Sequence, residues 1–216
     1  GNPANYTPIL KEHGIKVIHV VSSKRFALKA EQAGCDAVIA EGFEAGGHNG
    51  REETTSLVLV PLVSQSVAIP VIAAGGIATG RQMLAVMVLG AEGVQIGSRF
   101  VASNEASSHI NFKQAVINST EGETIFTLKE LTPVRMLKNH FYQEILKAEQ
   151  NHAGAEELKK LLGRGRSKKG MFEGDLDEGE LEIGQASILI NNIKPAAEIV
   201  SDIWAQFNEA LRMPIK

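Results

Sequence analysis

The sequence predicts an α/β protein with a parallel sheet covered by helices, and three observations lead to this fold class. Short runs of β-branched and apolar residues alternate with stretches whose apolar residues recur at helical spacing. The runs are almost continuously apolar, which is typical of strands covered by helices. Glycines follow several of the runs directly. The predicted strands are 16–21, 37–41, 70–74 and 93–96, and the predicted helices are 23–33, 54–66 and 79–89.

Local signals mark the ends of these elements. Thr54 and Thr79 are suitable N-caps for the second and third helices. Gly34 and Gly90 stand where helices commonly end. Pro61 lies inside the second helix and predicts a kink or an early end there.

The alternation stops after residue 100, so we expect a β/α domain over 1–102 and a helical extension over 103–216. Helices are predicted at 105–118 and 130–150. Residues 163–182 carry a basic and then an acidic cluster, which predicts a solvated, mobile loop. Pro195 opens a C-terminal helix, and Trp204 is expected to fill the core or an interface. The apolar stripe of that helix is Ala196, Ile199, Ile203, Phe207 and Leu211.

Composition excludes several classes of protein. A net charge of -3 and a pI near 6.1 argue against a nucleic-acid binder. No apolar run approaches the roughly 20 residues of a membrane span. Cys35 is the single cysteine, which excludes an internal disulfide and a Cys-based zinc site, and we expect it to pack in the core. No metal site is predicted, because metal-ligand spacing is absent from His13, His109, His140 and His152. The composition and the single cysteine lead us to expect a cytoplasmic protein.

The loop after the second strand is long for a β/α unit and contains EGFEAGGHNG, residues 41–50. Gly46 and Gly47 lack side chains, so a flat ligand can approach the backbone there. His48 brings an imidazole whose ordinary pKa of about 6.5 suits a general base. A flexible turn with an exposed histidine explains the same residues equally well. His19, within a strand, is interpreted as a core or barrel-interior residue.

Two further segments follow the third and fourth strands. Gly75 and Gly76 offer bare N–H donors, and Gly97 and Ser98 add backbone and hydroxyl groups. In β/α barrels two such neighbouring loops commonly form a phosphate site. Either pair alone is a weak signal, but together they favour a phosphate over plain turns.

The segments EGFEAGGHNG, IPVIAAGGIATG and GAEGVQIGSRF, in this order, resemble one FMN-dependent family. It contains the nitronate monooxygenases, once called 2-nitropropane dioxygenases, and the type II enoyl-ACP reductases. Asn2-Pro3 and Gly184-Gln185 also match the family, and the resemblance is strong over 1–102 and fainter beyond. It implies a (β/α)8 TIM barrel that binds FMN at the C-terminal ends of its strands.

The resemblance also implies roles for individual residues. His48 would face the substrate as a base or an orienting group, with NADH or NADPH as a possible co-substrate. The substrate would be an alkyl nitronate to be oxidised or an enoyl thioester to be reduced. The residues implied to hold the flavin phosphate are Gly75, Gly76, Gly97 and Ser98, and those implied to lie along the flavin are Ala45, Gly46 and Gly47.

The family's opening strands have no counterpart here, because Gly1 stands where a fifth strand-to-helix unit would begin. The chain therefore resembles a C-terminal half-barrel with a helical tail. Half of a closed sheet has two unpaired edges, which favours pairing with another chain, including a homo-oligomer. We expect the chain alone to bind FMN poorly.

Two other functions remain open from the residues alone. A sugar-phosphate isomerase or aldolase could use the same glycine cup without a flavin, although such enzymes usually need a lysine or paired carboxylates at strand ends. Only Glu41 and Glu44 lie near the predicted cup. A half-barrel without ligands could instead serve as an assembly partner. A bound yellow chromophore would exclude both.

Overall fold

The computed structural model describes residues 1–213 and divides the chain into two compact units. Unit 1 comprises 1–44, 52–96 and the C-terminal end from Asp202, and unit 2 comprises 45–51 and 97–201. The sequence predicted a single boundary after Ala102. The structure instead assigns the 45–51 loop to unit 2 and returns the C-terminal end to unit 1.

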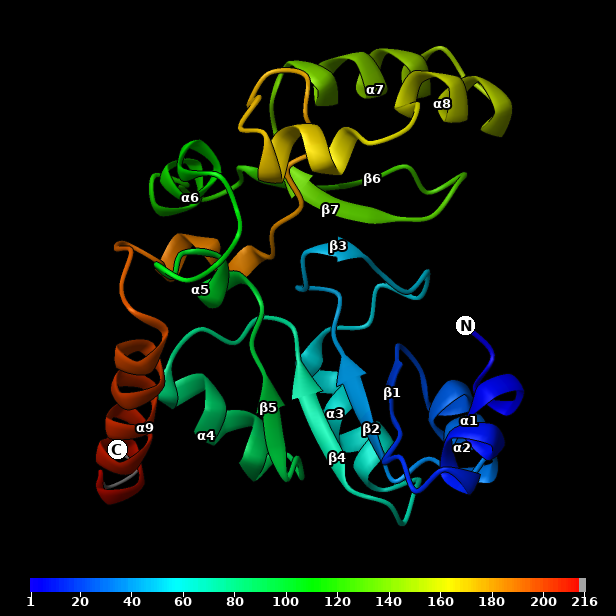
Figure 1. Ribbon diagram of the computed structural model, residues 1–216, viewed down its shortest axis with the longest axis vertical. Coiled ribbons are helices and arrows are strands. Elements are labelled where there is room, and N and C mark those ends of the chain that lie inside the picture. The colour runs from blue at the N-terminus through cyan, green and yellow to red at the C-terminus, as the bar shows by residue number, and fades with distance from the viewer. Residues whose placement is uncertain (214–216) are drawn as a thin grey trace. The chain divides into compact units, whose positions relative to one another are not determined.

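Unit 1 is built on a four-stranded parallel sheet with the strand order β1-β2-β4-β5 (Figure 1). All four predicted strands are present, and the register places Ile39 of β2 beside Ile72 of β4. Parallel neighbours in this order are what consecutive β/α units produce. The strands are β1 (Ile18–Val21), β2 (Ala37–Glu41), β4 (Val71–Ala74) and β5 (Gly93–Gln95).

The predicted helices of unit 1 also form, and a further one precedes the first strand. Thr79 caps its helix with a full capping box, in which its hydroxyl accepts from the Gln82 backbone N–H and the Gln82 side-chain oxygen accepts from the Thr79 backbone N–H. The cap predicted at Thr54 is one residue early, since Thr55 occupies that position. The early end at Pro61 is wrong, because the helix continues to Ser64. The helices are α1 (Pro3–Glu12), α2 (Lys24–Gln32), α3 (Ser56–Ser64) and α4 (Gly80–Val88).

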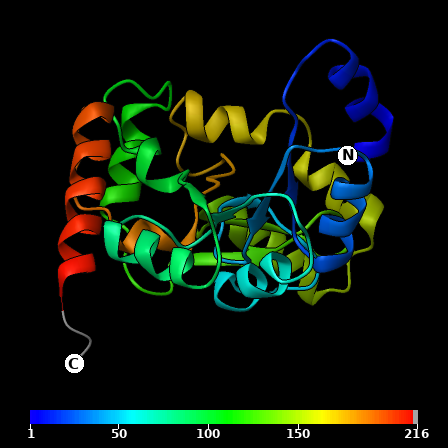
Figure 2. The same cartoon turned by 90° about the horizontal axis from the view of Figure 1, so that it is seen from below.

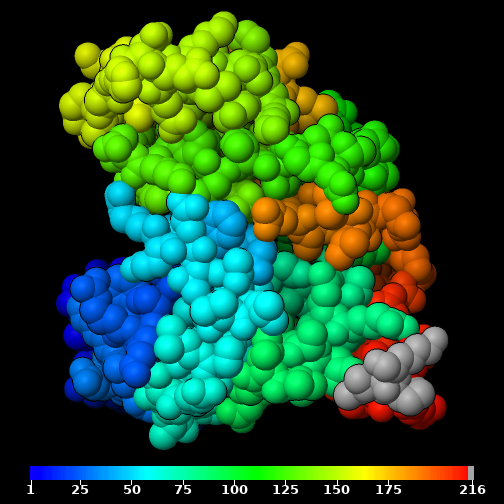
Figure 3. Space-filling model, turned by 180° about the vertical axis from the view of Figure 1, so that it is seen from behind, coloured from blue at the N-terminus to red at the C-terminus, as the bar shows by residue number. Residues whose placement is uncertain are grey.

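The core of unit 1 lies between the sheet and helices α2 and α3. Val38 and Ala40 of β2 are fully buried, as are Leu59 and Val63 of α3. Helix α3 (cyan in Figure 3) is apolar on its outer side as well, where Leu57 is 68% exposed. Burial of β-branched residues on the inner side is what holds the helices on the sheet.

Unit 2 contains a three-stranded antiparallel sheet that the sequence did not predict. Its order is β3-β7-β6, formed by β3 (Gly47–His48), β7 (Val134–Leu137) and β6 (Thr124–Thr127). The predicted helix 130–150 is wrong over its first part, because β7 occupies it and the helix begins at His140. All four β7 side chains are buried, so the strand shows no alternation to distinguish it from a buried helix.

Helices lie over this sheet (Figure 1) and complete unit 2, and Figure 2 shows the same ribbon from below. Phe141, Ile145 and Leu158 are fully buried against the strands and form the core with Met136. The extension predicted as helical is therefore mixed. The remaining elements are α5 (Ser98–Val101), α6 (Ile110–Ile117), α7 (His140–Gln150), α8 (Ala155–Leu162), the π-helix η1 (Lys168–Phe172) and the 3-10 helix η2 (Gln185–Leu189).

Residues 163–182 are not the solvated loop that their charge predicted. Gly170 of η1 is buried against the backbone of Gly179 and the side chain of Leu181. Glu180 is only 5% exposed. The charged residues therefore enclose buried ones, and the mobility expected of this segment stays a prediction.

The last helix, α9 (Ala196–Arg212), follows the predicted stripe. Ile199, Ile203 and Phe207 are buried, whereas Leu211 is exposed. Trp204 does not fill the core, because it is 56% exposed and stacks on Phe207 with ring centroids 5.3 Å apart. None of the helices within residues 1–213 is both long and apolar enough to cross a membrane.

Candidate functional site

In unit 1 the turns at the carboxyl ends of β2 and β4 approach each other through glycines. Gly75 has φ +89°, and a Cβ there would lie 2.7 Å from the carbonyl oxygen of Gly42. Gly76 has φ +73°, a left-handed conformation that glycine adopts without strain. Both predicted glycines are therefore required by the backbone itself. An ordinary glycine turn, without any ligand, is sufficient to explain the conformation of both residues.

Two carboxyl groups lie beside these turns. Glu44 accepts hydrogen bonds from the Ser56 N–H at 2.9 and 3.1 Å and from the Ser56 hydroxyl at 2.6 Å. The bonds tie the β2 turn to the first residue of α3, where a negative charge is favoured by the helix dipole. Burial raises the pKa of Glu41, the last residue of β2.

In unit 2 the segment with the predicted base is a short strand rather than a flexible turn. Gly47 pairs with Arg135 and His48 pairs with Val134 across β3 and β7. Asn49 fixes the turn, because its side-chain amide donates to the carbonyl oxygens of Ala45 at 2.9 Å and Gly47 at 3.1 Å. His48 itself is exposed, so its imidazole is held on a defined backbone and remains accessible.

Gly184 joins two of the predicted segments within unit 2. Its N–H donates to Ser98 Oγ at 3.0 Å. A Cβ on Gly46 would collide with the backbone of Ile183 and Gly184, so only glycine fits there. Gly97 differs, because nothing lies within 4 Å of the position that its Cβ would take. The Ser98 hydroxyl accepts from Gly184 and keeps its own proton to donate.

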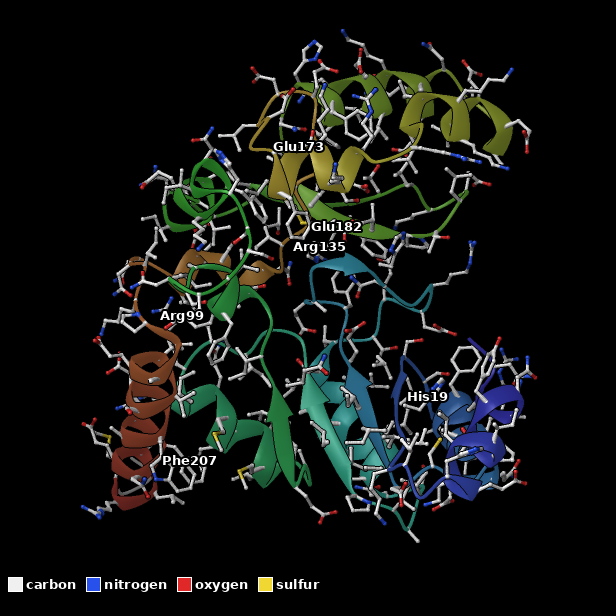
Figure 4. All side chains as sticks on the ribbon, viewed as in Figure 1. His19, Arg99, Arg135, Glu173, Glu182 and Phe207 are labelled. Carbon is white, nitrogen blue, oxygen red and sulfur yellow. The ribbon has the colours of Figure 1, made fainter. Side chains whose placement is uncertain are left out.

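The acidic end of the 163–182 segment also reaches this strand. Leu137 N–H donates to Leu181 O at 2.9 Å, and Met136 forms a bridge with Glu182. Since β6 covers the other edge of β7, residues 181–182 continue the edge that β3 begins. A Cβ on Gly47 would lie 2.6 Å from Glu182 Oε2. Figure 4 shows Glu182 and Arg135 near β7.

Three groups in this region form one polar cluster. Ser167 Oγ lies 2.8 Å from Glu180 Oε2 and 2.7 Å from Glu182 Oε1. Burial raises the pKa of Glu180, and the charge on Glu182 raises it further. The Ser167 hydrogen bond, His48 and Arg166 act in the opposite direction.

The predicted residues are thus divided between the units. Unit 2 brings Gly46, Ser98 and Gly184 together, with Gly47 and His48 on the adjoining strand. Gly75 and Gly76 belong to unit 1, and the phosphate cup that would join them to Gly97 and Ser98 stays a prediction.

Reasoning from the sequence missed Ser167, Glu180 and Glu182. The signal that could have found the glutamates is the alternation ELEI over 180–183, which has the period of a half-buried strand. It is short and follows a run of charged residues, so the net charge of the segment obscured it.

The weaker candidates have structural explanations. Cys35 is buried, with Sγ 3.6 Å from Thr7 Oγ1, as expected of a packing residue. His19 is partly buried at a cavity of about 270 Å³, and burial lowers its pKa (labelled in Figure 4). His140, Glu144 and Glu178 bring ligand atoms within 4.8 Å of one another, but Glu178 is already paired with His140 and Arg166.

Solved structures share the fold of this chain. FabK from Thermotoga maritima is 46% identical with a TM-score of 0.90, and the match covers 98% of this chain and 67% of that chain. Nitroalkane oxidase from Streptomyces ansochromogenes is 30% identical with a TM-score of 0.79, over 96% of this chain and 62% of that chain. The expected fold class, an α/β chain of the TIM-barrel type, is confirmed.

Sequence comparison leads to the same group. A probable nitronate monooxygenase of Staphylococcus aureus (strain MSSA476) is 36% identical over 212 residues, which is 94% of this chain and 59% of the relative. The chain therefore spans about three fifths of the curated relatives that it matches. The family model described as nitronate monooxygenase matches residues 2–206. The chain belongs to the nitronate monooxygenase family.

Proposed function

We propose that this chain supplies the base and part of the flavin site of an FMN-dependent oxidoreductase. Two features of unit 2 support the proposal: the open surroundings of Gly97 and the proton that Ser98 can donate. The observation that carries it is His48, exposed on a strand whose backbone is held by β7 and Asn49, in a chain of this family.

The residues present fit a flavin mononucleotide in chemical character. Within unit 2, Ser98 Oγ–H and the Gly97 backbone N–H would hold the phosphate, and Gly46 and Gly47 would lie along the ring. When bound, FMN would supply the group that accepts or donates electrons. The imidazole of His48 would take the proton beside a nitro group, or orient an enoyl thioester.

A comparison of two flavins tests the phosphate cup. Equilibrium dialysis should show that FMN binds more tightly than riboflavin, which lacks the phosphate, although both bind weakly to this chain alone. Ser98→Ala should narrow the difference. Ser108→Ala is the matched control, because the Ser108 hydroxyl donates to Val101 O at 3.0 Å instead. Equal affinity for the two flavins would contradict the cup, and binding of sugar phosphates without flavin would support the isomerase or aldolase alternative.

Turnover at saturating FMN decides between the substrate classes. Oxygen uptake with an alkyl nitronate indicates a nitronate monooxygenase, and NADH or NADPH consumption with a crotonyl thioester indicates an enoyl reductase. His48→Asn should lower the turnover rate of the reaction that is observed by about 100-fold or more, the usual contribution of a positioned base. His13→Asn, at an exposed position of unit 1, should leave it unchanged. Unchanged turnover in the His48→Asn variant would show that His48 takes no part in the reaction.

A further inference from the structure

The geometry around Ser167 requires a proton that no side chain of the cluster would ordinarily carry at neutral pH. The hydroxyl lies 2.8 Å from one Glu180 oxygen and 2.7 Å from one Glu182 oxygen. A serine hydroxyl has one hydrogen, so it can donate to only one of these carboxyl groups. The other contact is a hydrogen bond only if that carboxyl group carries a proton and donates it.

The surroundings favour such a proton. Glu180 is 5% exposed, and removal of a carboxylate from water favours its neutral form. Two carboxyl groups that meet at one hydroxyl also repel each other when both are ionised. Among the positive charges in this region, Arg166 bonds the carbonyl and carboxylate oxygens of Glu178, and Arg135 on β7 lies over the Phe126 ring. The π-helix lysines are committed to other carboxylates, Lys168 to Glu173 and Lys169 to Asp175.

The pair also contacts the strand that carries His48. Glu182 Oε2 lies against Gly47, where a side chain would leave no room for it. Glu180 is close enough to His48 for the imidazole to lower the pKa of its carboxyl group. Coupling between two titrating groups is reciprocal, so the proton on the pair and the charge on His48 depend on each other.

We propose that Glu180 and Glu182 share one proton through Ser167 at neutral pH, and that this pair positions His48 and responds to its charge. Its relevance to turnover rests on the proposed function. The pair would release its proton more readily once His48 has taken one, which limits the build-up of positive charge beside the substrate. Glu180 and Glu182 are therefore positioning residues, and His48 alone would touch the substrate.

Infrared spectroscopy tests the shared proton without any turnover. A protonated carboxyl group has a carbonyl stretching band that carboxylates lack, and the folded wild-type chain should show it at neutral pH. Glu180→Gln and Glu182→Gln should each remove the same band, because the remaining carboxylate then receives the Ser167 hydrogen and needs no proton. Glu41→Gln is the matched control, since Glu41 is a partly buried glutamate of unit 1 and its replacement should leave this band in place.

A band that survives in either variant would overturn the sharing of the proton, as would its absence from the wild type. If the variants do not fold, titration of the wild type is sufficient, because the band must persist at neutral pH and disappear at higher pH while the protein stays folded. Loss of the band only on unfolding in acid would contradict the proposal.

Nuclear magnetic resonance tests the link to His48. In the wild type the ring ¹⁵N shifts of His48, assigned with His48→Asn, should change when the pair titrates, and Glu180→Gln should abolish that change. Unaltered His48 shifts across the titration would reduce the pair to a structural role. Neither measurement depends on flavin, so failure of the flavin proposal would be seen separately in the dialysis experiment.

Discussion

The two units hold their glutamate side chains with a serine in each case, but with different numbers of donors. In unit 1, Ser56 supplies both its N–H and its hydroxyl to the single carboxylate of Glu44. In unit 2, Ser167 offers one hydroxyl to two carboxyl groups. A site with sufficient donors anchors a charge, as at a helix start, whereas a site with too few must retain a proton. The same residue types therefore serve as a fixed anchor in one unit and as a titrating group in the other.

The largest expected effect compares the two hydrophobic cores. Leu59 in unit 1 and Leu158 in unit 2 are both fully buried, so replacement of either by alanine should lower the free energy of unfolding by about 2–5 kcal/mol. Urea denaturation measures this. Leu57→Ala, at a position 68% exposed, should change it by less than about 0.5 kcal/mol. An equal loss at Leu57 would mean that the outer side of α3 is covered.

The next effect concerns how closely the backbone packs in unit 2. Gly46→Ala should lower the free energy of unfolding by about 2 kcal/mol or more, because the new Cβ meets the Ile183 and Gly184 backbone. Gly97→Ala should have little effect on stability, since its surroundings are open and its φ of -99° suits alanine. If flavin approaches Gly97, the same replacement should weaken FMN binding, which dialysis can detect. A stable Gly46→Ala variant would contradict the close packing.

A smaller effect tests the anchor in unit 1. Ser56→Ala removes the hydroxyl bond to Glu44 but keeps the N–H bonds, so the free energy of unfolding should fall by about 1–2 kcal/mol. Ser66→Ala is the control, because the Ser66 hydroxyl donates to the Leu62 carbonyl at the end of its own helix. Thermal or urea denaturation at neutral pH compares the two. A loss no larger than that of Ser66→Ala would show that the N–H bonds alone hold Glu44.

The difference between the units also explains what could be predicted. The strands of unit 1 follow from local patterns, because buried runs such as 37–41 and 71–74 stand between helical segments and pair with neighbours in sequence. The sheet of unit 2 joins Gly47–His48 to Val134–Leu137, far apart in the chain, and one of its strands has only two residues. No local period reveals such a pairing.

The candidate site likewise contains residues that a local signal predicts and residues that only the fold brings together. Glycines and His48 carry a local signal, and a match of segments to one family identified them. The carboxyl pair depends on the fold of 163–182, where Gly170 packs on Gly179 and turns Glu180 inward. Charge patterning assigned this segment to solvent because the sum of its charges contains no information on which side chain is buried.

The smallest effect, and the sharpest contrast, is the pH dependence of one carboxyl group from each unit. Hydrogen bonds from Lys11 and from the Val17 N–H lower the pKa of Asp36 in unit 1. Its stabilisation should be complete above the ordinary aspartate range and should be lost as pH falls, so Asp36→Asn should matter at neutral pH and little in acid. Glu180 in unit 2 shifts upward, chiefly because of burial, so its folded form favours the proton. Its contribution should be complete below the ordinary glutamate range and should be lost as pH rises through the raised pKa.

Wild type should therefore become less stable relative to Glu180→Gln as pH increases, and less stable relative to Asp36→Asn as pH decreases. Urea midpoints measured across the pH range for the three proteins give both slopes. Parallel slopes would mean that Glu180 is ionised in the folded state at neutral pH. In that case the carboxyl group of unit 2 would be an anchor like Glu44, and the contrast between the units would disappear.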